Sequence, residues 1–259
     1  MTASALWKEL TAEDINALAK AGAVVILPVA SMEQHGPHLP VGVDTILCEG
    51  VCKAAADRIR QDTPVIVAPT LWCGMAEHHM AFGGTFTFDI PTYRSVLIAF
   101  LQSIERAGFQ RVAIVNGHGG NVSALNALLP DFARHTSLDL IATTYFELAL
   151  PLLGGILEDQ TSVLHACELE TSLMMVLAPG TVKYDRIAEA IGPNFANSRH
   201  VLMPPAQRFR SLKSFTPNGV IGDPRRASQA KGEALLDACS KTLGELIANP
   251  GTWVGRNNG

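Results

Sequence analysis

Short apolar runs alternate with amphipathic segments along most of this chain, and this alternation limits the possible folds more than any other feature. The apolar runs predict buried strands at residues 23–29, 65–69, 111–116 and 138–146. Helices are predicted at 11–20, 45–60, 92–107, 122–135 and 228–248, and another starts after His165 and ends near Pro179. Strands that alternate with helices form right-handed βαβ units. We therefore expect an α/β protein whose mostly parallel sheet is covered on both faces.

The chain has 259 residues, 47% of them apolar, and we expect one domain over residues 1–259. Charged residues make up 17% and the net charge is -4, which does not resemble a nucleic-acid binder. No apolar run reaches the roughly 20 residues that span a membrane, and the N-terminus does not resemble a signal peptide. The five cysteines mostly lie in apolar contexts, which is typical of core residues in a reducing compartment. We expect a cytoplasmic protein with a small-molecule substrate and no nucleic-acid or membrane partner.

The loop after the first apolar run carries three potential metal ligands among glycines and prolines. Glu33 and His35 lie two residues apart, so their side chains point the same way on an extended chain. Asp44 follows near the start of the next predicted helix, where a simple N-cap would also explain an aspartate. Carboxylates and an imidazole without a thiolate suit a divalent cation. The loop therefore predicts a metal site that contains Glu33, His35 and Asp44.

His118 follows the third apolar run in the segment Asn116-Gly117-His118-Gly119-Gly120-Asn121. The first two glycines resemble the start of a dinucleotide fingerprint, but Val122 occupies the position of its third glycine, so nucleotide binding is a weak alternative. Glycines also let the backbone approach a ligand closely. Because the carboxyl ends of parallel strands lie at one edge of a sheet, His118 can join the first three ligands.

These side chains exceed what a single metal ion needs. The surplus favours two ions about 3.5–4 Å apart that share a bridging carboxylate and hold a hydroxide between them. Asp44, a short carboxylate near a helix N-terminus, is the expected bridge.

A third polar segment, from His165 to Ser172, lies at the start of a predicted helix. Glu168 and Glu170 are two residues apart and cannot share a helix face, so we expect one to reach the metal site and the other to face solvent or a partner. Acids in a first helical turn are also favoured by the macrodipole alone. His165 is positioned to protonate a leaving nitrogen, with a structural histidine as the alternative.

Other catalytic patterns are absent: the sequence has no Gly-x-Ser-x-Gly elbow, no His-Glu-x-x-His helix and no phosphate-binding Gly-x-x-x-x-Gly-Lys. The mechanism that these residues still allow is attack by a water molecule that a metal ion activates.

The three polar segments together resemble the signatures of the creatininase (creatinine amidohydrolase) family, over about residues 5–245. The most specific of them is Glu33-Gln34-His35-Gly36-Pro37-His38-Leu39-Pro40, followed by Asp44.

The resemblance implies a three-layer α/β/α sandwich, a dinuclear site, hydrolysis of non-peptide amide C–N bonds and a homohexamer built as a trimer of dimers. Two divalent ions are expected in each chain, zinc first, with manganese or iron as alternatives. The resemblance places Glu33, His35, Asp44 and His118 on metal-ligand positions, with Asp44 as the bridge. It also places Glu170 at the position of the remaining ligand and catalytic acid, and His165 at the position of a catalytic histidine. Residues expected at the substrate are His79, Gly119 and Gly120.

Two features separate the chain from creatininase itself. Gly119 and Gly120 stand where creatininase has tyrosine and glutamate, and no tryptophan occurs around residues 160–164, where the creatinine pocket has them. Double-glycine relatives include formylamide hydrolases and a peptidase of a modified peptide precursor. We expect hydrolysis of a small cyclic amide, lactam or formamide. The alternatives are a peptidase acting on a small modified peptide precursor and a non-catalytic metal- or ligand-binding protein.

Residues 191–226 have no clear periodicity. The basic residues of this part of the chain are Arg199, Arg208, Arg210, Lys213, Arg225 and Arg226. They could bind a phosphate or carboxylate of the substrate or line a subunit interface, and the irregular, arginine-rich composition favours the interface.

Overall fold

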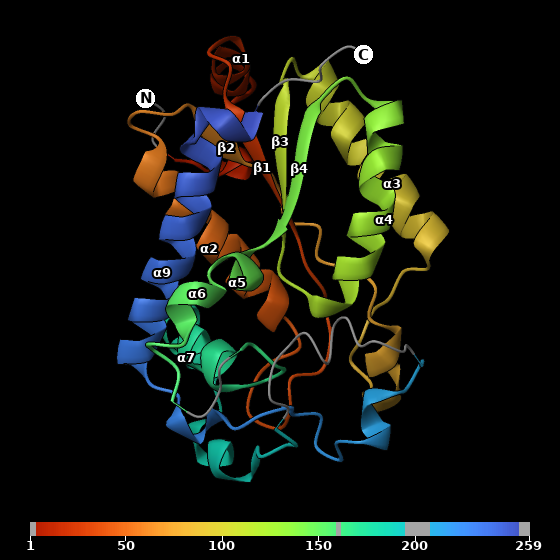
Figure 1. Ribbon diagram of the computed structural model, residues 1–259, viewed down its shortest axis with the longest axis vertical. Coiled ribbons are helices and arrows are strands. Elements are labelled where there is room, and N and C mark those ends of the chain that lie inside the picture. Colours follow the sequence, from red (N-terminus) through yellow and green to blue (C-terminus); the bar gives the residue numbers. More distant parts are fainter. Residues whose placement is uncertain (1–3, 159–161, 195–207, 254–259) are drawn as a thin grey trace.

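The computed structural model describes residues 4–158, 162–194 and 208–253, and it contains one parallel sheet of four strands (Figure 1). The strands are β1 (Val24–Val29), β2 (Val65–Val67), β3 (Arg111–Asn116) and β4 (Asp139–Thr144). Their spatial order is β2-β1-β3-β4, and every neighbouring pair is parallel. The predicted α/β class is confirmed.

Helices cover both faces of the sheet (Figure 1). They are α1 (Ala12–Lys20), α2 (Val43–Ile59), α3 (Ile90–Arg106), α4 (Val122–His135), α5 (Tyr145–Leu148), α6 (Leu150–Leu153), α7 (Glu168–Leu177) and α9 (Gln229–Ala248). Successive side chains of β1 alternate between two cores, because a strand points its residues to opposite faces. Val25 and Leu27 pack with α3 and α4, whereas Val24 and Ile26 pack with α2, α7 and α9. The result is a three-layer sandwich.

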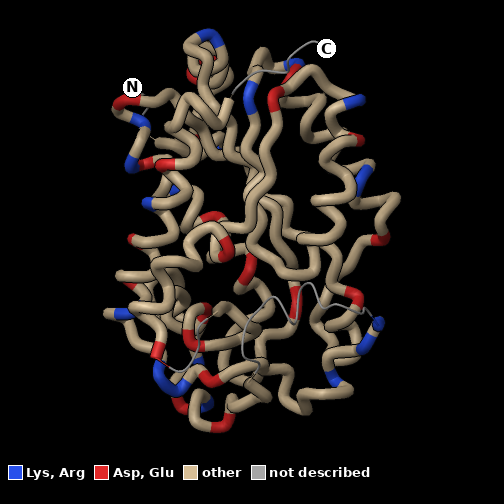
Figure 2. Tube along the Cα trace, in the orientation of Figure 1, with Lys and Arg blue, Asp and Glu red and all other residues tan. Residues whose placement is uncertain are grey.

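Short 3-10 helices lie in the connections. They are η1 (Trp7–Glu9), η2 (Glu77–Phe82), η3 (Gly119–Asn121), η4 (Pro179–Thr181), η5 (Tyr184–Glu189), η6 (Leu212–Ser214), η7 (Pro224–Arg226) and η8 (Pro250–Trp253). The connections that follow the strands gather at the end of the sheet opposite α1 (Figure 1). Acidic and basic residues are interspersed over the molecule (Figure 2). All five cysteines are buried and unpaired, and no helix among the described residues is long and apolar enough to cross a membrane.

Several boundaries differ from the sequence-based prediction. Helix α2 begins at Val43 and is preceded by Gly42, so Asp44 lies inside the first turn and is not the N-cap. Strand β4 ends at Thr144, and Tyr145 starts α5, which makes the predicted strand too long. Helix α3 begins at Ile90 because the side chain of Asp89 caps it by accepting the N–H of Thr92 at 2.8 Å.

Candidate metal centre

Three segments that are far apart in sequence meet at the carboxyl end of the sheet. Strands β1 and β3 are neighbours, and Val29 pairs with Asn116 at their ends. The loop before α2 and the segment after β3 therefore start side by side, and the first turn of α7 joins them. All five predicted metal ligands are buried there: Glu33, His35, Asp44, His118 and Glu170.

The carboxylate of Asp44 lies between two imidazoles. Its Oδ1 is 3.1 Å from Nε2 of His35, and its Oδ2 is 3.0 Å from Nδ1 of His118. Glu33 Oε2 is 3.1 Å from the same nitrogen of His118, and Glu170 Oε1 is 3.8 Å from Nε2 of His35. The residues thus form two donor sets that share Asp44, one with Glu33 and His118 and the other with His35 and Glu170.

In His35 and His118, the ring nitrogen that does not face the carboxylates contacts a backbone carbonyl oxygen. His35 Nδ1 lies 3.1 Å from the carbonyl oxygen of Glu33, and His118 Nε2 lies 3.2 Å from that of Met75. A carbonyl oxygen only accepts hydrogen bonds, so each of these nitrogens carries a hydrogen. In the neutral rings, the lone pairs then face the carboxylates. This is the tautomer and orientation that a metal-binding histidine adopts.

Unsatisfied polar atoms support a metal in this position. Buried side-chain atoms in proteins almost always have a hydrogen-bond partner. When the two rings are neutral, Glu33 Oε2, His35 Nε2 and Asp44 Oδ2 are buried and have none. Donor atoms of these three residues also lie within 4.8 Å of one another. The donor set is made of carboxylates and imidazoles, so the residues present fit divalent cations.

The ionisable groups of the centre shift each other's pKa. Burial by itself would lower the pKa of His118, but the carboxylates of Glu33 and Asp44 raise it to about 10. Burial also opposes protonation of His35, yet Asp44 and Glu170 raise its pKa well above the usual value. Burial would raise the pKa of Asp44, but the two histidines lower it. Metal binding near neutral pH must therefore displace protons from both rings.

His165 and His79 lie on the other side of Glu33. Nδ1 of His165 is 3.6 Å and Nε2 of His79 is 3.3 Å from Glu33 Oε1. Burial, and then the positive charge of His35, lowers the pKa of His165 well below its usual value, so this ring is neutral. Its Nε2 lies 2.8 Å from the carbonyl oxygen of Gln34, which places the hydrogen there and the lone pair on Nδ1.

Gln34, which was not among the site residues predicted from the sequence, connects these histidines. Its Oε1 accepts the N–H of Gly36 at 3.0 Å, which fixes the orientation of the amide. Its Nε2 is therefore the donor, 3.0 Å from the carbonyl of Gly219 and 3.0 Å from Nδ1 of His79. His79 then carries its hydrogen on Nε2, facing Glu33. The only sequence signal for this role was the position of Gln34 between two predicted ligands.

The two asparagines around His118 hold its loop. Asn116 accepts the N–H of His118 at 3.0 Å and donates to its carbonyl at 2.8 Å. Asn121 donates to the carbonyl of Ala30 at 3.2 Å and accepts the N–H of Met75 at 2.9 Å. This links the loops that follow β1, β2 and β3.

Gly120 is required by packing beside His118. A Cβ at this position would lie 2.4 Å from Nε2 of His118 and 2.4 Å from the carbonyl oxygen of Met75. Gly119 is the first residue of the same 3-10 turn, η3. The roles of Gly119, Gly120 and His79 in substrate binding stay predictions, and His79 is buried against Glu33 and Gln34.

Glu168 and Glu170 have different environments although both lie in the first turn of α7. Glu170 faces His35, and its Oε2 accepts the N–H of Cys167 at 3.4 Å. Glu168 is completely buried and forms an ion pair with Lys231 of α9. Of these two glutamates, only Glu170 borders the candidate metal centre, and Glu168 joins two helices.

Comparison with known proteins places these residues in a family context. The family model described as "Creatininase: Creatinine amidohydrolase" matches residues 8–247. The chain is 29% identical to the mycofactocin precursor peptide peptidase of Mycobacterium tuberculosis, over 87% of this chain and 86% of that protein. It is 28% identical to the creatinine amidohydrolase of Pseudomonas putida, over 95% of this chain and 97% of that protein.

Solved structures agree with the sequence matches. A crystal structure of creatininase has a TM-score of 0.77 at 26% identity and covers 95% of this chain and 97% of its own. Two further similar structures are described as a Zn-Zn type and as an Mn form of creatininase. The family model covers nearly the whole chain, and the chain therefore belongs to the creatininase family.

Proposed function

We propose that this protein is a metal-dependent hydrolase that cleaves an amide bond in a small peptide substrate. The observation that carries the proposal is the position of Asp44, whose two oxygens face His118 and His35 in two adjoining donor sets. A binding protein has no need of a shared carboxylate between two sets of ligands. The choice of a peptide rests on the similarity to the mycofactocin precursor peptide peptidase.

Glu33, Asp44 and His118 would hold one ion, and His35, Asp44 and Glu170 the other. Two divalent ions bound there would supply Lewis acids that polarise an amide carbonyl and acidify a water molecule. Zinc is the expected metal, with manganese or iron as alternatives, and the related Zn-Zn and Mn creatininase structures support the first two.

His165 is assigned the proton transfer to the departing nitrogen. Its Nε2 is engaged by the carbonyl of Gln34, which leaves the Nδ1 lone pair toward Glu33. The neutral ring takes a proton at Nδ1 from the attacking water, whose oxygen bonds to the carbonyl carbon. It passes this proton to the departing nitrogen as the C–N bond breaks.

Hydrolysis of a small cyclic amide is the second candidate. It is favoured by the similarity to creatinine amidohydrolase, which extends over 95% of the chain. A neutral lactam and a peptide would present the same kind of carbonyl group and nitrogen to the metal centre. Only assays with both classes of substrate can therefore distinguish the two candidate functions.

The test uses protein purified without added metal or chelator, in the wild-type form and as Asp44→Asn. Elemental analysis should give two equivalents of metal per wild-type chain, and mass spectrometry should detect new amino termini in a pool of N-acetylated peptides. Asp44→Asn should lose metal and activity together, whereas Asp57→Asn, which pairs with Lys53 on the surface, should keep both.

Three outcomes would contradict the proposal. Hydrolysis of creatinine, lactams or formamides without peptide cleavage would favour the second candidate. Absence of all hydrolysis after metal reconstitution would leave a metal-binding protein. Retained activity in Asp44→Asn would remove the bridging role. The expected hexamer is a separate prediction, which light scattering tests.

A further inference from the structure

The basic residues of the segment before α9 have different partners. Arg225 pairs with Asp223 at 2.6 Å, and Arg226 pairs with Glu158 at 3.5 Å. Lys213 donates to the carbonyl of Ala81 at 3.4 Å and lies over the ring of Phe82. Arg199 lies outside the described residues. Arg208 and Arg210 differ from the others, because neither forms an ion pair or a hydrogen bond in the described part of the chain.

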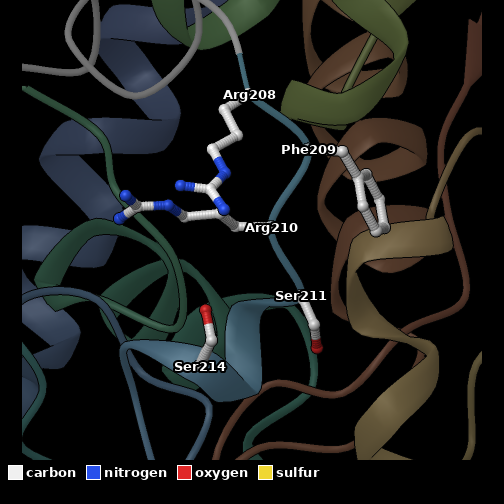
Figure 3. A pocket seen from close by; sticks show the side chains of 5 residues that line it. All are labelled: Arg208, Phe209, Arg210, Ser211 and Ser214. Atoms are coloured by element: carbon white, nitrogen blue, oxygen red, sulfur yellow. The ribbon is translucent and has the colours of Figure 1, made fainter.

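Arg208 and Arg210 line a pocket of about 440 Å³ together with Phe209, Ser211 and Ser214. Residues two apart on an extended chain point to the same side. Figure 3 shows both guanidinium groups on one side of the segment and the ring of Phe209 on the other. The hydroxyl of Ser214 points toward the side of the arginines in the same view. Two unpaired positive charges in one pocket favour an anionic ligand.

The chain connects this pocket to the metal centre. Leu212 of η6 is buried, and Lys213 ties η6 to η2, which carries His79. The carbonyl of Gly219 accepts from Gln34, and the backbones of Ile221 and His165 exchange hydrogen bonds of 2.8 and 3.1 Å. Residues 208–221 therefore run from the two arginines to the groups that orient His79 and His165.

We propose that Arg208 and Arg210 bind the carboxylate of the peptide substrate, an inference that rests on the function proposed above. A guanidinium group offers two parallel N–H donors to a carboxylate, and two such groups surround one anion. A neutral cyclic amide has no group that would compensate these charges. The pocket thus selects a peptide by its acidic terminus while the metal centre acts on an internal amide bond.

The experiment measures binding directly, so it gives an answer whether or not a peptide is cleaved. Two pools of randomised hexapeptides carry fluorescein at the N-terminus and end in a carboxylate or in a carboxamide. Fluorescence anisotropy gives the Kd of each pool for the metal-loaded protein. The wild type should bind the carboxylate pool about tenfold more tightly, and added salt should reduce the difference.

The double variant Arg208→Gln/Arg210→Gln should bind both pools within about twofold, with an unchanged metal content. The matched control is Arg106→Gln/Arg134→Gln, which removes two exposed arginines of α3 and α4 and keeps the carboxylate preference. For peptides that are cleaved, KM should rise in the double variant while kcat stays the same.

Equal binding of the two pools by the wild type would overturn the proposal, even if peptides are hydrolysed. If the double variant still prefers the carboxylate pool, the bound metals and not the arginines hold the peptide carboxylate, which would also overturn the proposal. If inorganic phosphate binds the wild type and not the double variant while the pools remain equivalent, the pocket takes a free anion. A double variant that changes oligomeric state, with no preference in the wild type, would assign both arginines to a subunit contact.

Discussion

The carboxylate of Asp44 lies 3.0 Å from the imidazole of His118, although Asp44 belongs to the first turn of α2 and His118 to the segment after β3. Asp44 is held in the first turn of α2, and His118 is held by Asn116 at the end of β3. Neither residue can move away without disturbing a buried element. The preformed contact explains why metal binding, proton balance and stability should be coupled in this protein.

Replacement of the two neighbouring glutamates of α7 should separate metal binding from stability. Glu170→Gln weakens the donor set of His35, so we expect one metal equivalent per chain instead of two and a loss of activity of more than about 100-fold. Glu168→Gln should keep both metals and lose about 1–3 kcal/mol of stability, because it removes the buried carboxylate charge that pairs with Lys231. Elemental analysis and thermal denaturation of both variants test this. Loss of metal in Glu168→Gln, with both metals retained in Glu170→Gln, would contradict the assigned roles.

Gln34→Ala should lower kcat by about 10–100-fold while both metals remain bound. The substitution removes the donor to His79 Nδ1 and to the carbonyl of Gly219, so the hydrogen of His79 is no longer fixed toward Glu33. Gln34→Glu should behave in the same way, because an ionised carboxylate accepts the N–H of Gly36 but cannot donate. Gln102→Ala, which removes a surface hydrogen bond to His135, is the control. Loss of metal in Gln34→Ala would show a structural role.

Gly120→Ala should weaken metal binding and cost about 1–3 kcal/mol of stability. The added methyl group would overlap Nε2 of His118 and the carbonyl of Met75, so the imidazole must leave its position. Gly180→Ala is the control, since a methyl group there would meet no atom within 4 Å and the residue is exposed. Metal titration followed by thermal denaturation measures both effects. Normal metal affinity in Gly120→Ala would contradict the assigned packing.

Metal-free protein should lose stability as the pH rises from about 6.5 to 10. The pKa of His118 is raised to about 10 in the folded chain and is about 6.5 in an unfolded one, so folding binds a proton. This contribution, on the order of a few kcal/mol, is complete below the unfolded pKa and disappears as the pH passes the folded pKa. His35, whose pKa is also raised, acts in the same direction.

The metal-loaded protein should lack this decline, because the ions replace the protons between the same carboxylates. The difference in melting temperature between the two forms should therefore increase from pH 6.5 to 10. Metal loading near neutral pH should also release protons, which calorimetry in buffers of different ionisation enthalpy counts. A constant difference and no proton release would contradict the charge state assigned to the centre.

Much of the architecture was predictable from local signals. The apolar runs located all four strands, and the helix signals located α1, α2, α3, α4, α7 and α9. Because β1 and β3 are parallel neighbours, the loops that follow them had to lie side by side, and the meeting of His118 with the first loop was predictable. Helix boundaries were predicted less accurately than the helices themselves, since the cap of α3 and the early start of α2 depend on side-chain and loop geometry.

The sequence by itself determined the types of donor, their grouping into three segments and the parallel topology that brings these segments together. The tertiary structure alone decided which glutamate of α7 faces the centre, which ring nitrogen of each histidine is free, and that Gln34 links His79 to Gly219. The reason is physical. Periodicity records which residues are buried, whereas hydrogen-bond partners depend on the directions of side chains from elements that meet only after packing.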